Sequence, residues 1–98
     1  MKLWLDDLRP APEGWLWVKT AKEAMRAITS NKISVISLDH DLGLIDEDGG
    51  QVLRWLEEQI FANGFLGPTV EIHTMNIVAR GWMLKVARKI NGRIAEEL

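Results

Sequence analysis

The sequence contains no cysteine, and this absence excludes several kinds of protein at once. Without thiols the chain can form no disulfide scaffold, no cysteine nucleophile and no thiolate metal site. Long hydrophobic runs are also missing: the longest are about four residues, such as Trp15–Val18, whereas a membrane helix needs roughly 20. The first nine residues hold two aspartates and no apolar signal core, so we expect a cytoplasmic protein.

Positive charge is scarce as well. The 12 basic residues are outnumbered by 14 acidic ones, which gives a net charge of -2 and disfavours a protein that coats nucleic acid. The apolar share of 47% is ordinary for a folded globular protein, so disorder is excluded as the main interpretation. A chain of 98 residues is too short for two cores, and we predict a single domain over residues 1–98.

Short apolar segments alternate with helical patterns along the chain. Four segments rich in β-branched and aromatic residues predict strands at residues 3–5, 15–18, 35–38 and 70–73. Three segments predict helices: one capped by Thr20, one that begins near Gly50 and ends at Asn63-Gly64, and one from about Ala79 to Ile90 that Asn91-Gly92 breaks or ends. This alternation favours a parallel sheet covered by helices on both faces. Only a short link joins the first two strands, so the direction of the second strand stays open.

Polar side chains follow three of the predicted strands. The carboxyl ends of parallel strands lie along one edge of a sheet, so these residues are expected to meet in one crevice. They are Asp6, Asp7 and Arg9 after the first strand, Asp39, His40 and Asp41 after the third, and His73, Thr74 and Asn76 at the end of the fourth.

The acidic residues of this group favour a metal ion. Four carboxylates in one crevice repel one another unless a cation joins them, and oxygen ligands suit Mg²⁺. We therefore predict Asp6, Asp7, Asp39 and Asp41 as metal ligands. The alternative is that Asp6 and Asp7 are ordinary turn residues.

The two histidines, His40 and His73, are the only ones in the chain, and both map to this edge. Two imidazoles near neutrality can share general-acid and general-base roles, whereas a purely structural role for each is the commoner case. Two other features have plainer interpretations. The acidic segment at residues 46–48 is read as a solvated loop able to act as a lid. Trp15 and Trp17 alternate on one strand, which favours a packed face over an exposed platform for a base.

Parts of the sequence resemble the receiver domains of response regulators. Residues 18–24, followed by 35–39, are similar to the second strand, second helix and third strand of a receiver. Asp6 and Asp7 then resemble its metal-binding acidic pair, Asp39 takes the place of its phospho-acceptor, and Thr74 matches its hydroxyl position. The receiver's first helix, and its fifth strand with the lysine that pairs with the aspartyl phosphate, have no counterpart in this sequence. This absence argues against an ordinary phospho-signalling cycle.

A fuller resemblance is to cyclic-phosphate processing receiver domains. It rests on Leu-Asp-Asp-Leu-Arg-Pro at residues 5–10, Leu-Asp-His-Asp-Leu-Gly at residues 38–43, Gly50 before a helix with Trp55-Leu56, and Ile-His-Thr at residues 72–74 with Asn76 and Met83. The resemblance implies metal-aided chemistry on a cyclic phosphate, from an RNA end or a nucleotide. His40, His73 and Asp39 would then be catalytic, and Arg9, Thr74 and Asn76 would bind the substrate.

The expected fold is a three-layer, receiver- or flavodoxin-like α/β domain. It has a truncated, mainly parallel four-stranded sheet of order 2-1-3-4 and about three helices. The expected function is a Mg²⁺-dependent phosphoesterase whose partner is a small cyclic phosphate or an RNA end. Two alternatives remain: a degenerate receiver that accepts a phosphoryl group or binds a phosphorylated partner, and an interaction protein that uses its tryptophans and its basic last helix. A homodimer is compatible with the sequence, and a membrane partner is not expected.

Overall fold

The computed structural model describes residues 1–43 and 48–97. The chain forms seven elements in the order β1(Lys2–Leu5), β2(Trp15–Val18), α1(Ala21–Ser30), β3(Val35–Leu38), α2(Gly49–Phe61), β4(Thr69–Ile72) and α3(Ile77–Glu97). All seven match segments that the sequence predicted, and β4 ends one residue earlier than expected, so that His73 lies just beyond it.

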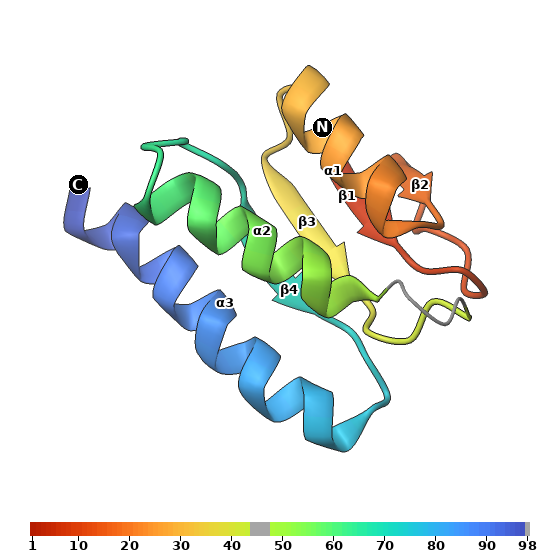
Figure 1. Cartoon of the computed structure of the whole chain (residues 1–98). Helices are drawn as coiled ribbons and strands as arrows, with labels where there is room; N and C mark the ends of the chain where they lie inside the picture. The colour runs from red at the N-terminus through yellow and green to blue at the C-terminus, as the bar shows by residue number, and fades with distance from the viewer. Residues whose placement is uncertain (44–47, 98) are drawn as a thin grey trace.

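The four strands form one parallel sheet in the order β2-β1-β3-β4, as predicted (Figure 1). The direction of the second strand, left open by the sequence, is parallel to β1. Residues 6–14 connect the two strands without a helix, and the indole Nε1 of Trp4 donates a hydrogen bond of 3.0 Å to the carbonyl of Arg9. This bond fastens the return loop to the sheet, which explains how a short connection replaces a helical crossover.

The three helices lie on the same face of the sheet, the near face in Figure 1, and they pack side by side in the order α1, α2, α3. The hand of the crossovers explains the positions of α1 and α2, because β2 to β3 and β3 to β4 both step in the same direction across the sheet. The last helix, α3, packs on β4 and on α2. The layering therefore differs from the expected three layers, because the receiver-like α/β fold has a single helical layer on one face of the sheet. The core lies between sheet and helices and includes Leu3, Leu5, Ile36, Leu38, Leu53, Leu56 and Met83.

The opposite face of the sheet carries the tryptophans of β1 and β2. Trp4 is paired in register with Trp17, and its ring meets that of Trp15 edge-on at 6.0 Å. Trp17 is 36% exposed, and its indole Nε1 donates a 2.7 Å hydrogen bond to the carbonyl of Asp6. The prediction of a packed face for Trp15 and Trp17 thus needs a correction, because no helix of the described chain covers them. Trp15 contacts Trp4 and the ammonium group of Lys2, and Trp17 contacts the ammonium group of Lys19.

Local side-chain bonds set the helix boundaries. Thr20 caps α1 by accepting the backbone N–H of Glu23, as predicted. Asp48 caps α2 through a reciprocal capping box with Gln51, so this helix begins at Gly49. The rest of the acidic segment predicted as a lid lies outside the described residues.

The last helix does not end at Asn91-Gly92, where the sequence predicted a break, and it continues to Glu97. The side chain of Asn91 accepts from the backbone N–H of Val70 at 2.8 Å and donates to the carbonyl of Val70 at 2.9 Å. Asn91 therefore completes the hydrogen bonding of the edge strand β4 instead of terminating a helix. Packing of the helix against the sheet outweighs the low helix propensity of Asn and Gly.

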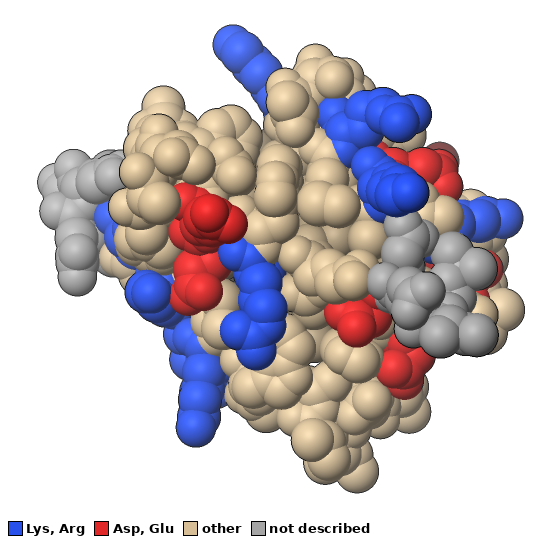
Figure 2. Space-filling view, in the orientation of Figure 1, with Lys and Arg blue, Asp and Glu red and all other residues tan. Residues whose placement is uncertain are grey.

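The surface shown in Figure 2 has no single basic patch, because its lysine and arginine side chains are spread over several places. Among the described helices, none combines the length and apolar character that crossing a membrane requires.

Candidate functional site

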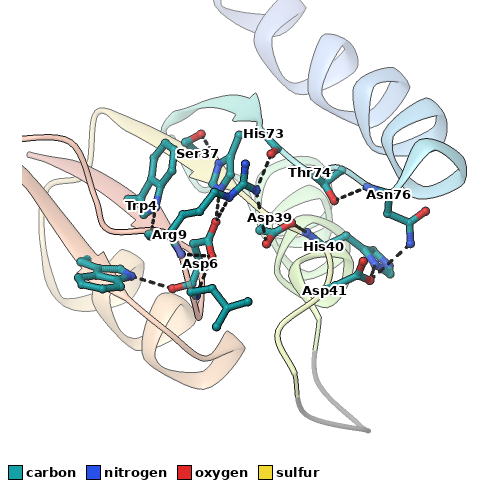
Figure 3. A network of polar contacts seen from close by, with 12 residues as sticks. Trp4, Asp6, Arg9, Ser37, Asp39, His40, Asp41, His73, Thr74 and Asn76 are labelled. Carbon is teal, nitrogen blue, oxygen red and sulfur yellow. Dashed lines mark hydrogen bonds and ion pairs between the residues drawn. The ribbon is translucent and has the colours of Figure 1, made fainter.

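The polar residues that follow β1, β3 and β4 are brought together at the carboxyl edge of the sheet (Figure 3). Hydrogen bonds of the sheet continue one residue past the strands: the N–H of Asp39 donates to the carbonyl of Leu5, and the N–H of His73 donates to that of Leu38, both at 3.0 Å. The strand ends are thereby held in fixed register. Their side chains form two clusters, one around Asp6 and one around His40.

Asp6 is the centre of the first cluster and is 1% exposed. Its Oδ1 accepts the backbone N–H groups of Leu8 at 2.9 Å and Arg9 at 2.8 Å. Its Oδ2 accepts from Nε of Arg9 at 2.9 Å and lies 3.1 Å from Nε2 of His73. Both carboxylate oxygens are therefore paired, and Asp6 shapes the loop after β1 as well as holding the arginine.

Arg9 connects the three strand ends. Beyond its ion pair with Asp6, its Nη2 donates to the carbonyl of His73 at 2.9 Å and lies 3.7 Å from Oδ2 of Asp39. Burial alone would raise the pKa of Asp6, but the hydrogen bonds from Arg9, Leu8 and His73 and the positive charge of Arg9 outweigh it and lower that pKa. Asp6 is accordingly ionised at neutral pH.

His73 is held on three sides. Its ring stacks on Trp4 with centroids 3.8 Å apart, its Nδ1 lies 2.7 Å from Oγ of Ser37, and its Nε2 faces Asp6. Burial lowers the pKa of His73 and the positive charge of Arg9 lowers it further, while the bond to Asp6 opposes the shift without cancelling it. Because an ionised carboxylate only accepts, the neutral ring carries its proton on Nε2, and Nδ1 accepts from Ser37.

The series Ser37, His73, Asp6 has the order of a hydrolase triad but not its geometry. Ser37 lies in the middle of β3 and is 2% exposed, so its hydroxyl cannot reach a substrate. Sequence reasoning missed Ser37 and Trp4 as partners of His73. Strand alternation was the available signal, because Trp4 and Ser37 are paired in register and therefore point to the same face of the sheet.

Asp39 lies between the two clusters, at the start of the loop after β3. Its Oδ1 accepts the backbone N–H of His40 at 2.8 Å, and the residue is 8% exposed. The amino end of α2 presses against it: a Cβ added to Gly49 would lie 1.5 Å from the carbonyl oxygen of Asp39. Glycine at position 49 is therefore what allows the helix to approach this strand end so closely.

The second cluster contains His40, Asp41 and Asn76. Nδ1 of His40 lies 2.7 Å from Oδ1 of Asp41, and Nδ2 of Asn76 donates to the same oxygen at 3.4 Å. The bond with His40 is the main cause that lowers the pKa of Asp41, and Asn76 adds to it against a smaller effect of burial. Nε2 of His40 lies 3.7 Å from Oδ2 of Asp48, which is beyond hydrogen-bond distance.

Thr74 and Asn76 shape the start of α3. Oγ1 of Thr74 accepts the N–H of Asn76 at 3.2 Å, and Oδ1 of Asn76 accepts the N–H of Ala79 at 3.0 Å. Thr74 is 1% exposed, so its hydroxyl acts on the backbone of this loop. Three side chains were predicted to bind the substrate, Arg9, Thr74 and Asn76, and Thr74 is the least accessible of them.

A cleft of about 430 Å³ opens beside the clusters. Its lining residues are Asp6, Asp7, Leu8, Arg9, Asp39, Asp41 and Met75. Asp7 lies close to Gly43, where an added Cβ would come within 2.7 Å of its Oδ2. Four carboxylates and one guanidinium thus share one cleft, and a cation could reduce the repulsion among these carboxylates.

Oxygen and imidazole donors suitable for a metal ion meet here. One donor atom each from Asp6, Asp39 and His73 lies within 4.8 Å of the others, so this cluster can hold an ion. Asp6 and His73 are hydrogen-bonded to each other, so an ion would have to compete with that bond. Asp7 and Asp39 also line the cleft and offer further carboxylate oxygens. The donor set of the cleft therefore fits a hard cation. Asp41, whose side chain is 67% exposed, is the more accessible carboxylate, and the side chain of Asp39 is only 11% exposed.

Comparison with known protein families agrees with this geometry. Residues 1–89 match the model of the family described as cyclic-phosphate processing receiver domain. The chain belongs to this family. The match includes all four strands, α1, α2 and every residue of both clusters. No curated protein and no solved structure matches the chain.

Proposed function

We propose that this receiver-like domain is an enzyme that opens a cyclic phosphate, derived from an RNA end or a nucleotide, to a phosphate monoester. The observation that carries the proposal is the meeting of Arg9, Asp39, Asp7 and Asp41 in one cleft beside two histidines, in a chain whose family processes cyclic phosphates. Such a reaction needs charge stabilisation on the phosphoryl oxygens and a route for protons. The cleft offers groups for both.

Water is the co-reactant of the proposed reaction. Its oxygen forms a new bond to phosphorus while one ring P–O bond breaks, one proton leaves the water, and one proton is delivered to the released sugar oxygen. The products are a monoester and a free hydroxyl group, with no change of oxidation state. Arg9 is placed to hold phosphoryl oxygens, because its side chain is 45% exposed and the ends of three strands fix its guanidinium.

A divalent cation, for which Mg²⁺ is our proposal, belongs in the same cleft. Asp7 and Asp39 would hold it, with Asp41 nearby, and Asp6 would keep its structural bonds. When bound, such an ion neutralises charge on a phosphoryl oxygen. The excess of carboxylates over basic groups supports this requirement, since an anionic substrate would otherwise be repelled.

The two histidines differ in their suitability for proton transfer. Asp41 orients His40 through Nδ1, and Nε2 of His40 has no hydrogen bond to another described residue. Both ring nitrogens of His73 are engaged, by Ser37 and by Asp6. We therefore assign proton transfer mainly to His40, and we assign to His73 the positioning of Asp6 and thereby of Arg9.

The test is turnover of a panel of 2′,3′-cyclic nucleotides by the purified protein with Mg²⁺, followed by ³¹P NMR. We expect the cyclic-phosphate signal to be replaced by a monoester signal, and we expect Asp39→Asn to abolish the conversion. Arg54→Gln is the control, because Arg54 lies over the ring of Trp82 and outside the cleft. A wild-type protein that is folded, loaded with Mg²⁺ and inactive on the whole panel would contradict the proposal.

A second candidate is a phospho-accepting signalling domain. The place of Asp39 at the end of β3 in a receiver-like sheet favours it. Incubation with a small phosphodonor such as acetyl phosphate would then add the mass of a phosphoryl group, and Asp39→Asn would remove that gain. This function requires neither histidine, so His40→Gln separates it from the enzymatic one.

A further inference from the structure

Two large apolar side chains line the acidic cleft although they are almost fully exposed. Leu8 is 81% exposed and Met75 is 82% exposed, and every other residue that lines the cleft is charged. Single exposed apolar residues are common on proteins and need no explanation. Two of them at the mouth of one charged cleft form a surface with a distinct chemistry.

The two residues come from loops that Arg9 ties together. Leu8 precedes Arg9 in the loop after β1, and Met75 follows His73 by two positions in the loop between β4 and α3. The guanidinium of Arg9 donates to the carbonyl of His73 at 2.9 Å, which links these loops. The apolar side chains therefore stand beside the group that is assigned to hold phosphate.

This arrangement determines which cyclic phosphates suit the cleft. Apolar walls favour a flat, weakly polar ring, while the guanidinium favours the phosphate attached to it. A volume of about 430 Å³ is in the range of small-molecule sites. An inference about substrate recognition by this cleft rests on the proposed function. The experiment must therefore distinguish failure of the inference from failure of the proposed function.

We propose that the cleft recognises a cyclic phosphate that carries a nucleobase, with the base against Leu8 and Met75 and the phosphate at Arg9. A cyclic phosphate without a base loses the apolar contact and binds more weakly. The larger purine ring covers more of this surface than a pyrimidine, so purines bind more tightly. Both a nucleotide and the terminal residue of an RNA have this chemistry.

The experiment compares the affinities of three probes by calorimetry with Mg²⁺ present. The probes are 2′,3′-cyclic AMP, glycerol 1,2-cyclic phosphate, which has no base, and a short oligoribonucleotide that ends in a 2′,3′-cyclic phosphate. His40→Gln protein is used beside the wild type, so that turnover does not distort the titration. We expect cyclic AMP to bind on the order of tenfold or more tightly than the probe without a base.

The variants identify the residues responsible. The double variant Leu8→Asn, Met75→Gln is expected to lose the preference for 2′,3′-cyclic AMP. Its affinity for glycerol 1,2-cyclic phosphate is expected to stay unchanged. Leu66→Asn is the matched control, because Leu66 is 79% exposed and does not line this cleft. These three side chains lie at the surface, so the variants remain folded.

The outcomes separate cleanly. Equal wild-type affinity for the probes with and without a base overturns the inference while the proposed function stands, and so does a preference that survives the double substitution. Wild-type protein that neither binds nor opens any probe overturns both. Tighter binding of the oligoribonucleotide than of cyclic AMP identifies an RNA end as the source of the base, equal binding identifies a nucleotide, and either result supports base recognition.

Discussion

The two polar clusters at the carboxyl edge of the sheet contain the same pair of residue types in opposite conditions. In the first, Asp6 is buried, the side chain of His73 is only 13% exposed, and the polar side-chain atoms of both have partners. In the second, the side chain of Asp41 is 67% exposed and His40 keeps one ring nitrogen without a hydrogen bond to another described residue. Asp6 and His73 are therefore a structural pair, whereas Asp41 and His40, at the same edge of the sheet, are a candidate catalytic pair.

The difference shows what burial does to a polar group. A buried carboxylate must be fully paired, and once it is paired it holds its neighbours rigidly and has little left for a ligand. An exposed pair contributes little to stability and remains available for chemistry. Substitutions in the two clusters should accordingly affect different measurements.

The largest expected effect is on turnover. His40→Gln should lower kcat on a cyclic nucleotide by about 10²–10⁴-fold, because it removes the proposed proton-transfer group. The free energy of unfolding in urea should change by less than about 1 kcal/mol, since the side-chain partner of His40, Asp41, is largely exposed to water. If the variant kept the wild-type kcat, His40 would not be the proton-transfer group, and the second cluster would not have the proposed catalytic role.

The second prediction concerns stability. Asp6→Ala leaves the backbone N–H groups of Leu8 and Arg9 and the Nε2 proton of His73 without their acceptor, at about 1–3 kcal/mol for each group that water does not reach. We expect the free energy of unfolding in urea to fall by about 3 kcal/mol or more. Asp41→Ala is the matched control and should cost about 1 kcal/mol or less. Equal losses for the two variants would erase the contrast between the clusters.

A smaller loss is expected where α2 meets the strand end. Gly49→Ala places a methyl group against the carbonyl of Asp39 and should cost about 1–3 kcal/mol, measured by thermal or urea unfolding. Gly81→Ala in α3 is the control, because an added Cβ there meets nothing within 4 Å, and it should be neutral or stabilising. If Gly49→Ala were as harmless as the control, the close approach of α2 to Asp39 would be wrong.

The smallest effect is the dependence of stability on pH. The pKa of His73 is lowered in the folded protein from its ordinary 6.5, so below about pH 6.5 the unfolded chain takes up this proton more readily. Stability is complete above that pH and falls as the pH drops toward the folded value. Asp6, whose pKa is lowered from 3.8, adds a further loss below about pH 4. Urea titrations of the metal-free protein from pH 7.5 to 5 should show the first loss, and His73→Asn should remove it.

Most of the fold follows from local sequence signals. Apolar runs predicted the strands, and the cap at Thr20 together with the spacing of apolar residues predicted the helices. The layering was not predicted, although the sequence showed no counterpart of the receiver's first helix. The expectation of helices on both faces came from the general pattern of parallel sheets. The continuation of α3 through Asn91 also depends on a tertiary contact, with Val70, that no local pattern displays.

The members of the site were predictable in the same way, and their internal pairing was not. Parallel strand ends bring Asp6, Asp39 and His73 to one edge, as the order of elements indicated. The prediction from the sequence gave His40 and His73 equivalent roles, because both lie at strand ends. Strand alternation places Trp4 and Ser37 on one face of the sheet, and three-dimensional packing adds that both contact the ring of His73.

The contrast between the two histidines can be measured in a single metal-free sample by long-range ¹H–¹⁵N NMR of their side chains. The structure predicts that His73 is neutral at pH 7 with its proton on Nε2, and that neutral His40 carries its proton on Nδ1, directed at Asp41. A charged His73 at pH 7, or the same tautomer for both rings, would contradict the division of this edge into a structural and a chemical cluster.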